Sequence, residues 1–173
     1  MITLNSDAAS TSLSKTTKAI LNEYGIKLNK NLGQNYLIDR NKRDQIIQFG
    51  NLTKDDVVLE IGPGIGTLTI ELAKRVKKVI AIEQDSNICQ ILENRLKKEN
   101  IDNVELINDD ALNVEFPKFD KIISNLPYQI SSPITFKFLN YDFQLAILMY
   151  QKEFASRMNG KVGSKDYSRL SAM

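Results

Sequence analysis

A glycine-rich segment, Glu60–Ile61–Gly62–Pro63–Gly64–Ile65–Gly66, is the first candidate for a ligand site. Glycines let a backbone turn sharply and approach a ligand closely, and the amides at the start of a following helix are free to bind it. The dinucleotide-binding pattern G-x-G-x-x-G would require a glycine at Thr67, but the third glycine here is Gly66. A tight structural turn would also explain the glycines. As a ligand site, the segment favours an uncharged part of a ligand over a pyrophosphate.

Acidic residues follow the next two apolar runs of the chain. Glu83 comes directly after residues 79–82, and a carboxylate at the end of a strand can accept hydrogen bonds from both hydroxyls of a ribose. The segment Asn108–Asp109–Asp110–Ala111 lies just past residues 104–107, where a carboxylate can accept a hydrogen bond from the amino group of an adenine. Either carboxylate alone can equally be an ordinary surface residue. Together with the glycine-rich segment, they predict a pocket shaped for adenosine.

The tetrapeptide Asn125–Leu126–Pro127–Tyr128 has the residue types needed to activate an aromatic amino group. The amino group of adenine is a poor nucleophile because its lone pair is delocalised into the ring. The Asn125 amide oxygen and the Leu126 carbonyl can accept from both N–H bonds and aim the lone pair at a methyl donor. Pro127 stiffens the turn, and Tyr128 offers a flat face on which an adenine can stack. No strong base is required, so the absence of histidine is no objection.

Short apolar runs rich in β-branched residues alternate with segments of helical periodicity from about residue 40 onward. We predict strands over residues 57–61, 79–82, 104–107, 121–124 and 145–149. We predict helices over residues 13–24, 42–50, 67–76, 87–100, 134–139 and 153–158, and disorder over residues 1–12. This alternation predicts an α/β fold with a mostly parallel sheet covered by helices on both faces. In such sheets ligands bind at the carboxyl ends of the strands, where all the polar signals fall.

The composition narrows the possible classes of chemistry. The chain has 173 residues, 42% hydrophobic and 25% charged, which is typical of one globular domain. It contains no histidine and a single cysteine, Cys89, which excludes histidine-based nucleophile activation and an intrachain disulfide, and we expect no metal site. No stretch approaches the roughly 20 apolar residues that span a bilayer. We therefore expect a cytoplasmic protein without a membrane partner.

At Asn125–Tyr128 the chain resembles the class I N6-adenine methyltransferases, whose motif here is N/D-P-P-Y or N-L-P-Y. Longer segments are similar to one family of these enzymes, the dimethyladenosine transferases of small-subunit ribosomal RNA (KsgA-type), and especially to its archaeal and eukaryotic branch. The segments that carry this resemblance are residues 28–39, 125–133, 149–155 and 163–171. The resemblance implies a Rossmann-like class I methyltransferase fold that uses S-adenosyl-L-methionine.

The resemblance also implies roles for individual residues. The residues that match contacts with S-adenosylmethionine are Asn35, Leu37, Gly62, Gly64, Glu83, Asp110 and Asn125. Those that match the catalytic motif holding the target adenine are Asn125, Leu126, Pro127 and Tyr128. The implied reaction is the transfer of two methyl groups to N6 of each of two adjacent adenosines near the 3′ end of small-subunit ribosomal RNA, during ribosome biogenesis.

The family pattern continues beyond the position of Met173, with further strands and a small helical domain that contacts RNA. We therefore expect residues 29–173 to be the catalytic domain, truncated at its carboxyl end. Residues 1–28 are expected to form a flexible extension with a short helix. The expected partner is small-subunit ribosomal RNA or the pre-ribosomal small subunit, and the expected state is a monomer.

Two other functions remain open at this point. The first is a non-catalytic relative that assists ribosome assembly or binds RNA, against which the intact Glu83, Asp110 and N-L-P-Y motif argue. The second is a different adenine methyltransferase, acting on large-subunit ribosomal RNA or on DNA. Leucine instead of proline after Asn125 disfavours the DNA enzymes.

Overall fold

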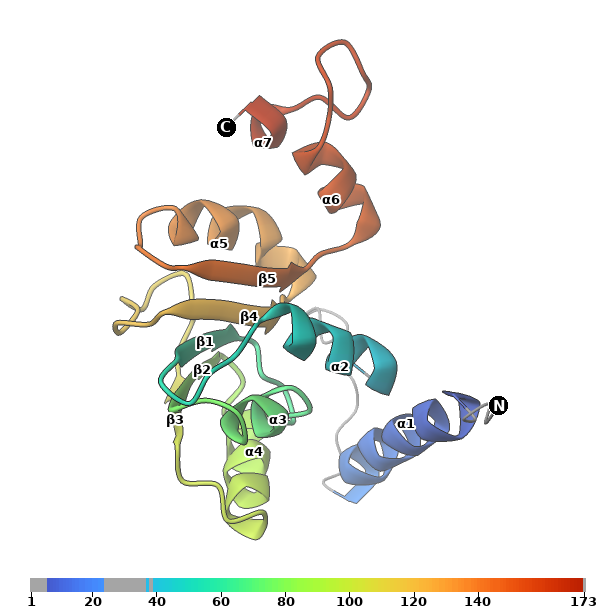
Figure 1. Cartoon of the computed structure of the whole chain (residues 1–173), viewed down its shortest axis with the longest axis vertical. Helices are drawn as coiled ribbons and strands as arrows, with labels where there is room; N and C mark the ends of the chain where they lie inside the picture. The colour runs from blue at the N-terminus through green and yellow to red at the C-terminus, as the bar shows by residue number, and fades with distance from the viewer. Residues whose placement is uncertain (1–5, 24–36, 38, 173) are drawn as a thin grey trace.

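Five strands form one parallel sheet in the part of the chain that the structure describes. The computed structural model describes residues 6–23, 37 and 39–172. The strands are β1 (Val57–Ile61), β2 (Lys78–Glu83), β3 (Val104–Asn108), β4 (Lys121–Asn125) and β5 (Leu145–Met149). They lie in the order β3-β2-β1-β4-β5, all parallel (Figure 1). The predicted strands and their parallel arrangement are confirmed, with small shifts at the strand ends.

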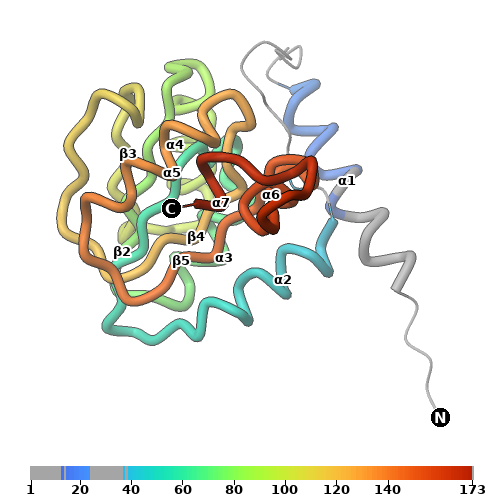
Figure 2. The backbone as a smooth tube through the Cα atoms, turned by 90° about the horizontal axis from the view of Figure 1, so that it is seen from above, coloured from blue at the N-terminus to red at the C-terminus, as the bar shows by residue number. Residues whose placement is uncertain are grey.

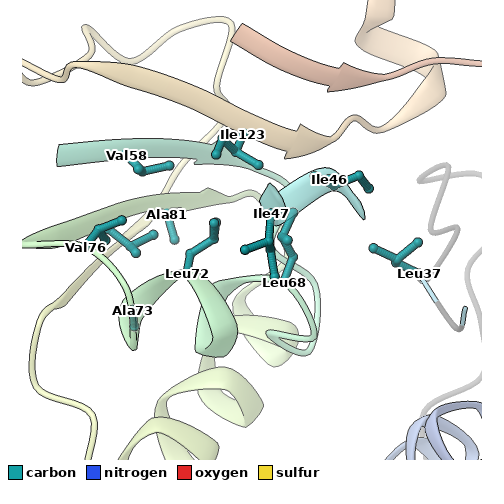
Figure 3. Close-up of a cluster of buried hydrophobic side chains, with 11 residues drawn as sticks. Leu37, Ile46, Ile47, Val58, Leu68, Leu72, Ala73, Val76, Ala81 and Ile123 are labelled. Atoms are coloured by element: carbon teal, nitrogen blue, oxygen red, sulfur yellow. The ribbon is translucent and has the colours of Figure 1, made fainter. Parts of the chain in front are cut away.

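Helices cover both faces of this sheet. One face packs against α2 (Arg40–Phe49), α3 (Thr69–Ala73) and α4 (Ser86–Lys98), and the other against α5 (Ser131–Phe138). Successive side chains of a strand point to opposite faces, so each strand supplies both cores. The buried strand residues on the α2 and α3 face include Val58, Ala81 and Ile123 (Figure 3). Val79 belongs to the same cluster. Those on the α5 face are Leu59, Ile61, Ile80, Ile82 and Ile122.

Aspartates start the two longest helices over the sheet. The Asp39 carboxylate accepts from the amides of Asn41 and Lys42 at 2.9 and 3.2 Å, which fixes the start of α2. Asp85 does the same for α4, accepting from two amides at 2.9 and 3.3 Å. Each such cap stabilises its helix by about 1 kcal/mol. Asp85 is therefore the residue that caps α4.

The helix at the amino end begins earlier than predicted. Helix α1 spans Ser6–Glu23, so the prediction of disorder over residues 1–12 is wrong for residues 6–12, while residues 1–5 lie outside the described part. The segment is rich in serine, but its alanines have high helix propensity and extend a helix already begun. The predicted helix over 67–76 shortens to α3 because residues 64–68 form turns. Two short helices were not predicted: η2 (Tyr128–Ile130) and α7 (Arg169–Ala172), which follows α6 (Lys152–Met158).

Helix α1 lies beside the sheet and next to α2 (Figure 2). Its Leu21 is buried against Ile65 of the glycine-rich segment and against Ile88 and Ile91 of α4. The glycine-rich segment therefore contacts α1 and α4 through Ile65. Within the described residues, no helix is long and apolar enough to cross a membrane.

A buried ion pair joins the amino ends of β1 and β4. The Lys121 ammonium group lies 2.9 Å from Oδ2 of Asp56 and donates to the carbonyl of Asn51 at 2.7 Å. The same Asp56 oxygen accepts from the amide of Thr53 at 2.6 Å. Burial raises the pKa of the Asp56 carboxyl, but Lys121 and Thr53 outweigh burial and hold the pKa below its usual value. Lys121 and Asp56 thus fix the connection that leads into the central strand.

Replacing Asp56 by alanine should destabilise the fold strongly. It would leave the Lys121 ammonium group buried without a carboxylate, which costs about 3–5 kcal/mol. Because the folded pKa of Asp56 is lowered, its contribution is present above about pH 3.8 and is lost as the pH falls below that value. Urea denaturation at pH 7 and at pH 3 measures both effects.

The control for this prediction is Asp55→Ala, which removes an exposed neighbouring carboxylate. Its free energy of unfolding should stay within about 0.5 kcal/mol of wild type, as for most surface substitutions. An Asp56→Ala variant as stable as the Asp55→Ala variant at pH 7 would contradict the role of the pair.

Candidate functional site

A pocket opens at the carboxyl edge of the sheet, where the strand order reverses between β1 and β4. The residues predicted for the site that line it are Leu37, Gly62, Gly64, Glu83, Asp110, Asn125 and Pro127. Leu126 and Tyr128 adjoin the pocket in sequence but do not line it. Asn35 lies outside the described residues. The structure thus brings together residues from the ends of four strands, as expected for a ligand site in a parallel α/β sheet.

Gly62 brings the glycine-rich segment against the tetrapeptide after β4. Its φ is +68°, a conformation that favours glycine, and its amide donates to the carbonyl of Ile82 at 2.9 Å. A Cβ atom added to Gly62 would lie 2.7 Å from Cγ of Pro127, closer than van der Waals contact allows. Gly62 therefore packs directly on Pro127, and no larger residue fits between the two segments.

The divergence of β1 and β4 makes room for this contact. Their paired register covers Val58 with Lys121 and Leu59 with Ile122. Further along, the Ser124 hydroxyl donates to the carbonyl of Ile61 at 2.6 Å, spanning the widening gap. The last residue of β4, Asn125, therefore reaches the pocket with its backbone held in place.

Glu83 ends β2 with its carboxylate turned toward the glycine-rich segment. Its Oε2 accepts from the amide of Gly64 at 3.2 Å, and its Oε1 accepts from the amide of Asp85 at 3.1 Å. Burial raises the pKa of Glu83, and these amides partly offset the rise. Both oxygens are thus oriented at the pocket wall, where they can accept from neighbouring hydroxyl groups of a ligand.

Asp110 forms the start of a short turn after β3. Its Oδ1 accepts from the amide of Leu112 at 2.9 Å, as in a helix cap. Its Oδ2 has a longer contact, 3.4 Å, with the amide nitrogen of the Asn113 side chain. Since Oδ1 is committed to the turn, Oδ2 is the oxygen better placed to accept a hydrogen bond from a ligand.

In the tetrapeptide after β4, some side chains pack in the core and others lie at the pocket. The Leu126 side chain is only 1% exposed and packs in the core under α5, so only its backbone can serve the site. Pro127 faces Gly62, and Tyr128 is half-buried at the start of η2. Leu126 acts as an anchor that holds the backbone of the motif at the pocket.

Glu60 is a pocket residue to which the sequence interpretation gave no role. It is 2% exposed, and its Oε2 has no hydrogen-bond partner among the described residues. Burial raises the pKa of Glu60 to about 8, with Thr69 opposing the rise and the nearby Glu83 adding to it. A lone acid in the apolar strand Val57–Ile61 was the available signal. A buried carboxyl group with an unpaired oxygen at a pocket can bind a ligand there, and a positively charged ligand would favour the ionised form of this carboxyl group.

The parallel sheet order, the glycine-rich segment after β1 and the acids after β2 and β3 define a Rossmann-like class I methyltransferase. A crystal structure of a dimethyladenosine transferase from Plasmodium falciparum superposes with a TM-score of 0.71 at 43% identity, covering 76% of this chain and 49% of that one. The structure of the 23S rRNA methyltransferase ErmE gives a TM-score of 0.69 at 34% identity, covering 79% and 55%.

A family model described as ribosomal RNA adenine dimethylase matches residues 25–173, and the chain belongs to this family. Two curated archaeal proteins, both named probable ribosomal RNA small subunit methyltransferase A, are similar to it. The protein from Methanosphaera stadtmanae is 58% identical, covering 90% of this chain and 57% of its own length. The protein from Methanothermobacter thermautotrophicus is 57% identical, covering 91% and 56%. The chain therefore spans a little over half the length of these relatives.

Glu60→Gln should flatten the pH dependence of stability in the ligand-free chain. Folded Glu60 keeps its proton up to about pH 8, whereas the unfolded residue loses it near pH 4.5. The folded state therefore binds more protons between these values. The free energy of unfolding falls as pH rises through this window, by up to about 1.4 kcal/mol per pH unit from this group. Urea denaturation at several pH values between 5 and 8 measures the slope.

The matched control for this prediction is Glu93→Gln, at an exposed position of α4. It should leave the slope of stability against pH as in wild type. A residual decline in Glu60→Gln is expected from Glu83, whose pKa is also raised. Identical slopes for wild type and Glu60→Gln would contradict the neutral state of Glu60.

Proposed function

We propose that this chain is the catalytic domain of an enzyme that dimethylates N6 of two adjacent adenosines near the 3′ end of small-subunit ribosomal RNA. The observation that carries the proposal is the packing of Gly62 on Pro127. It joins a pocket suited to adenosine with a motif suited to an adenine amino group. The family, and the names of the archaeal relatives and of the Plasmodium falciparum enzyme, support the same reaction.

The proposed cofactor is S-adenosylmethionine, which supplies an electrophilic methyl group when bound. Glu83 accepts from its ribose hydroxyls, and Asp110 accepts from its adenine amino group. Gly62 and Gly64 present backbone to its methionine portion, beside Leu37. The unpaired Oε2 of Glu60 fits a ligand with positive charge. A role for Asn35 rests on the family motif alone.

The proposed target site is the tetrapeptide after β4. The Asn125 amide oxygen and the Leu126 carbonyl accept from the two N–H bonds of the adenine amino group, which directs its lone pair toward the methyl donor. The buried Leu126 side chain and the contact of Pro127 with Gly62 keep these acceptors in place. Tyr128 stacks on the base. The methylated nitrogen is acidic enough to give its proton to water.

The proposed partner is small-subunit ribosomal RNA or the pre-ribosomal small subunit, met by a monomer in the cytoplasm. The proposed boundary between amino-terminal extension and catalytic domain, at residues 28–29, lies outside the described residues. Methylation of large-subunit RNA is a second candidate, favoured by the similarity to ErmE. The higher identity to the Plasmodium falciparum enzyme and to the archaeal relatives favours the small subunit. Methyl transfer to isolated small and large subunits, by the chain extended to the length of its relatives, distinguishes them.

Glu83→Ala should weaken the binding of S-adenosylmethionine. The variant loses two charge-assisted hydrogen bonds, each worth about 1.5–3 kcal/mol, so affinity should fall by about a hundredfold or more. Isothermal titration calorimetry with the purified chain measures it. Glu83→Gln, which keeps a side chain of the same size, separates loss of charge from loosening of the amides of Gly64 and Asp85. Wild-type affinity in Glu83→Ala would refute the pocket assignment.

Asn125→Ala should reduce methyl transfer far more than cofactor binding. Its amide oxygen is assigned mainly to the target amino group, and removing one such oriented group typically costs about a hundredfold or more in turnover. The assay is methyl incorporation into small subunits by the chain extended to the length of its relatives, with cofactor affinity measured in parallel. Asn140→Ala, an exposed position beyond α5, is the control. Near-normal turnover in Asn125→Ala would exclude the mechanism.

A further inference from the structure

The turn that carries Asp110 is held at both ends. At its start, the Asp110 carboxylate accepts from the amide of Leu112, and the Asp110 carbonyl accepts from the amides of Asn113 and Val114 at 2.9 and 3.1 Å. These bonds form about one turn of helix. The carbonyls at the end of so short a helix have no partners within it and need donors from elsewhere.

Lys137 of α5 supplies these donors. Its ammonium group donates to the carbonyl of Ala111 at 2.8 Å, to that of Leu112 at 3.2 Å and to that of Val114. An ammonium group has three N–H bonds, and this one has three carbonyl partners in the turn. The group also lies 4.3 Å from the centre of the Phe116 ring. The tip of the side chain is therefore fixed by four contacts.

The position of Lys137 connects the two halves of the site. Helix α5 follows the tetrapeptide after only the short η2 helix, so it is joined directly to the segment assigned to the target base. The turn after β3 carries the pocket residues Asp110 and Ala111. The packing of Phe116 with Phe138 and Leu126 in the same buried cluster supports this connection. Burial lowers the pKa of Lys137, while the nearby Asp110 and Glu115 carboxylates favour its charged form.

We propose that Lys137 is a positioning residue for base recognition: it holds the turn after β3 in the shape that presents Oδ2 of Asp110 to the amino group of the cofactor's adenine. This inference rests on the proposed function, since it assumes an adenosine ligand in the pocket. Without the ammonium group, three carbonyls in a partly buried turn lose their donor, and the turn must rearrange to reach water. Asp110 would then lose its fixed orientation.

The test compares two ligands that differ at one edge of the base. S-adenosylhomocysteine carries an amino group at C6 and an unprotonated N1, whereas its hypoxanthine analogue, S-inosylhomocysteine, carries an oxygen at C6 and a proton on N1. Calorimetry on the purified chain should show that wild type prefers the adenine ligand by about ten- to a hundredfold, the value of a hydrogen bond to a charged group. Lys137→Met, which keeps the length and packing of the side chain, should lose most of this preference.

Lys121→Met is the matched control, because it also removes an ammonium group bonded to a backbone carbonyl, but at the opposite edge of the sheet. It should lower stability and leave the ligand preference unchanged. Lys137→Arg keeps the charge and several donors, so it should keep more of the preference than Lys137→Met. Hydrogen exchange should speed up at the amides of Leu112 and Val114 in Lys137→Met, and not in the strands.

The outcomes separate this inference from the proposed function. If wild type binds neither ligand, the proposed cofactor site is wrong. If wild type prefers adenine and Lys137→Met keeps the same ratio of affinities, the positioning role is overturned. Should Lys137→Met fail to fold, Lys137→Gln, which retains one donor group, is measured by the same ratio. An unchanged ratio in that variant would overturn the inference equally.

Discussion

The contact between Gly62 and Pro127 is the constraint on which the rest of the site depends. The glycine-rich segment, assigned to the cofactor, and the tetrapeptide, assigned to the target adenine, pack there with no room for an added methyl group. The positive φ of Gly62 and the fixed ring of Pro127 are complementary, since one bends the backbone away and the other fills the space this leaves. The separation between the glycine-rich segment and the tetrapeptide is thus set by the backbone of Gly62 and the rigid ring of Pro127.

The two edges of the sheet serve different purposes. At the amino edge, Asp56 and Lys121 are fully paired and hold strand ends together. At the carboxyl edge, the acids Glu60 and Glu83 face a pocket, and their raised pKa values show that burial there is poorly compensated. Perturbed pKa values of this kind cluster at functional sites. The fold therefore keeps its poorly compensated acidic groups at one edge, where a ligand can bind to them.

Much of the fold and site could be predicted because local patterns encode them. Each strand is a short apolar run, and Glu83, Asp110 and Asn125 are recognisable because each stands at or just after a strand end. Contacts between distant residues could not be predicted in this way. Nothing in the sequence around Lys137 indicates that its partners are carbonyls 23–26 residues earlier. Likewise, Glu60 is visible as the acid of an apolar strand, but its raised pKa depends first on its burial in the folded chain and then on the positions of Thr69 and Glu83.

The reversal of strand order has a consequence for how the molecule folds. Strands β1, β2 and β3 pair with neighbours close in sequence, whereas the Ser124–Ile61 bond that completes the site closes a loop of 63 residues. Closing a longer loop costs more chain entropy, so β4 is expected to join the sheet after the first three strands have paired. Before β4 joins the sheet, Gly62 of the glycine-rich segment cannot pack on Pro127. A ligand that needs both segments can therefore bind only chains in which β4 has joined the sheet. Its binding stabilises the product of this late folding step and not the earlier pairing of β1, β2 and β3.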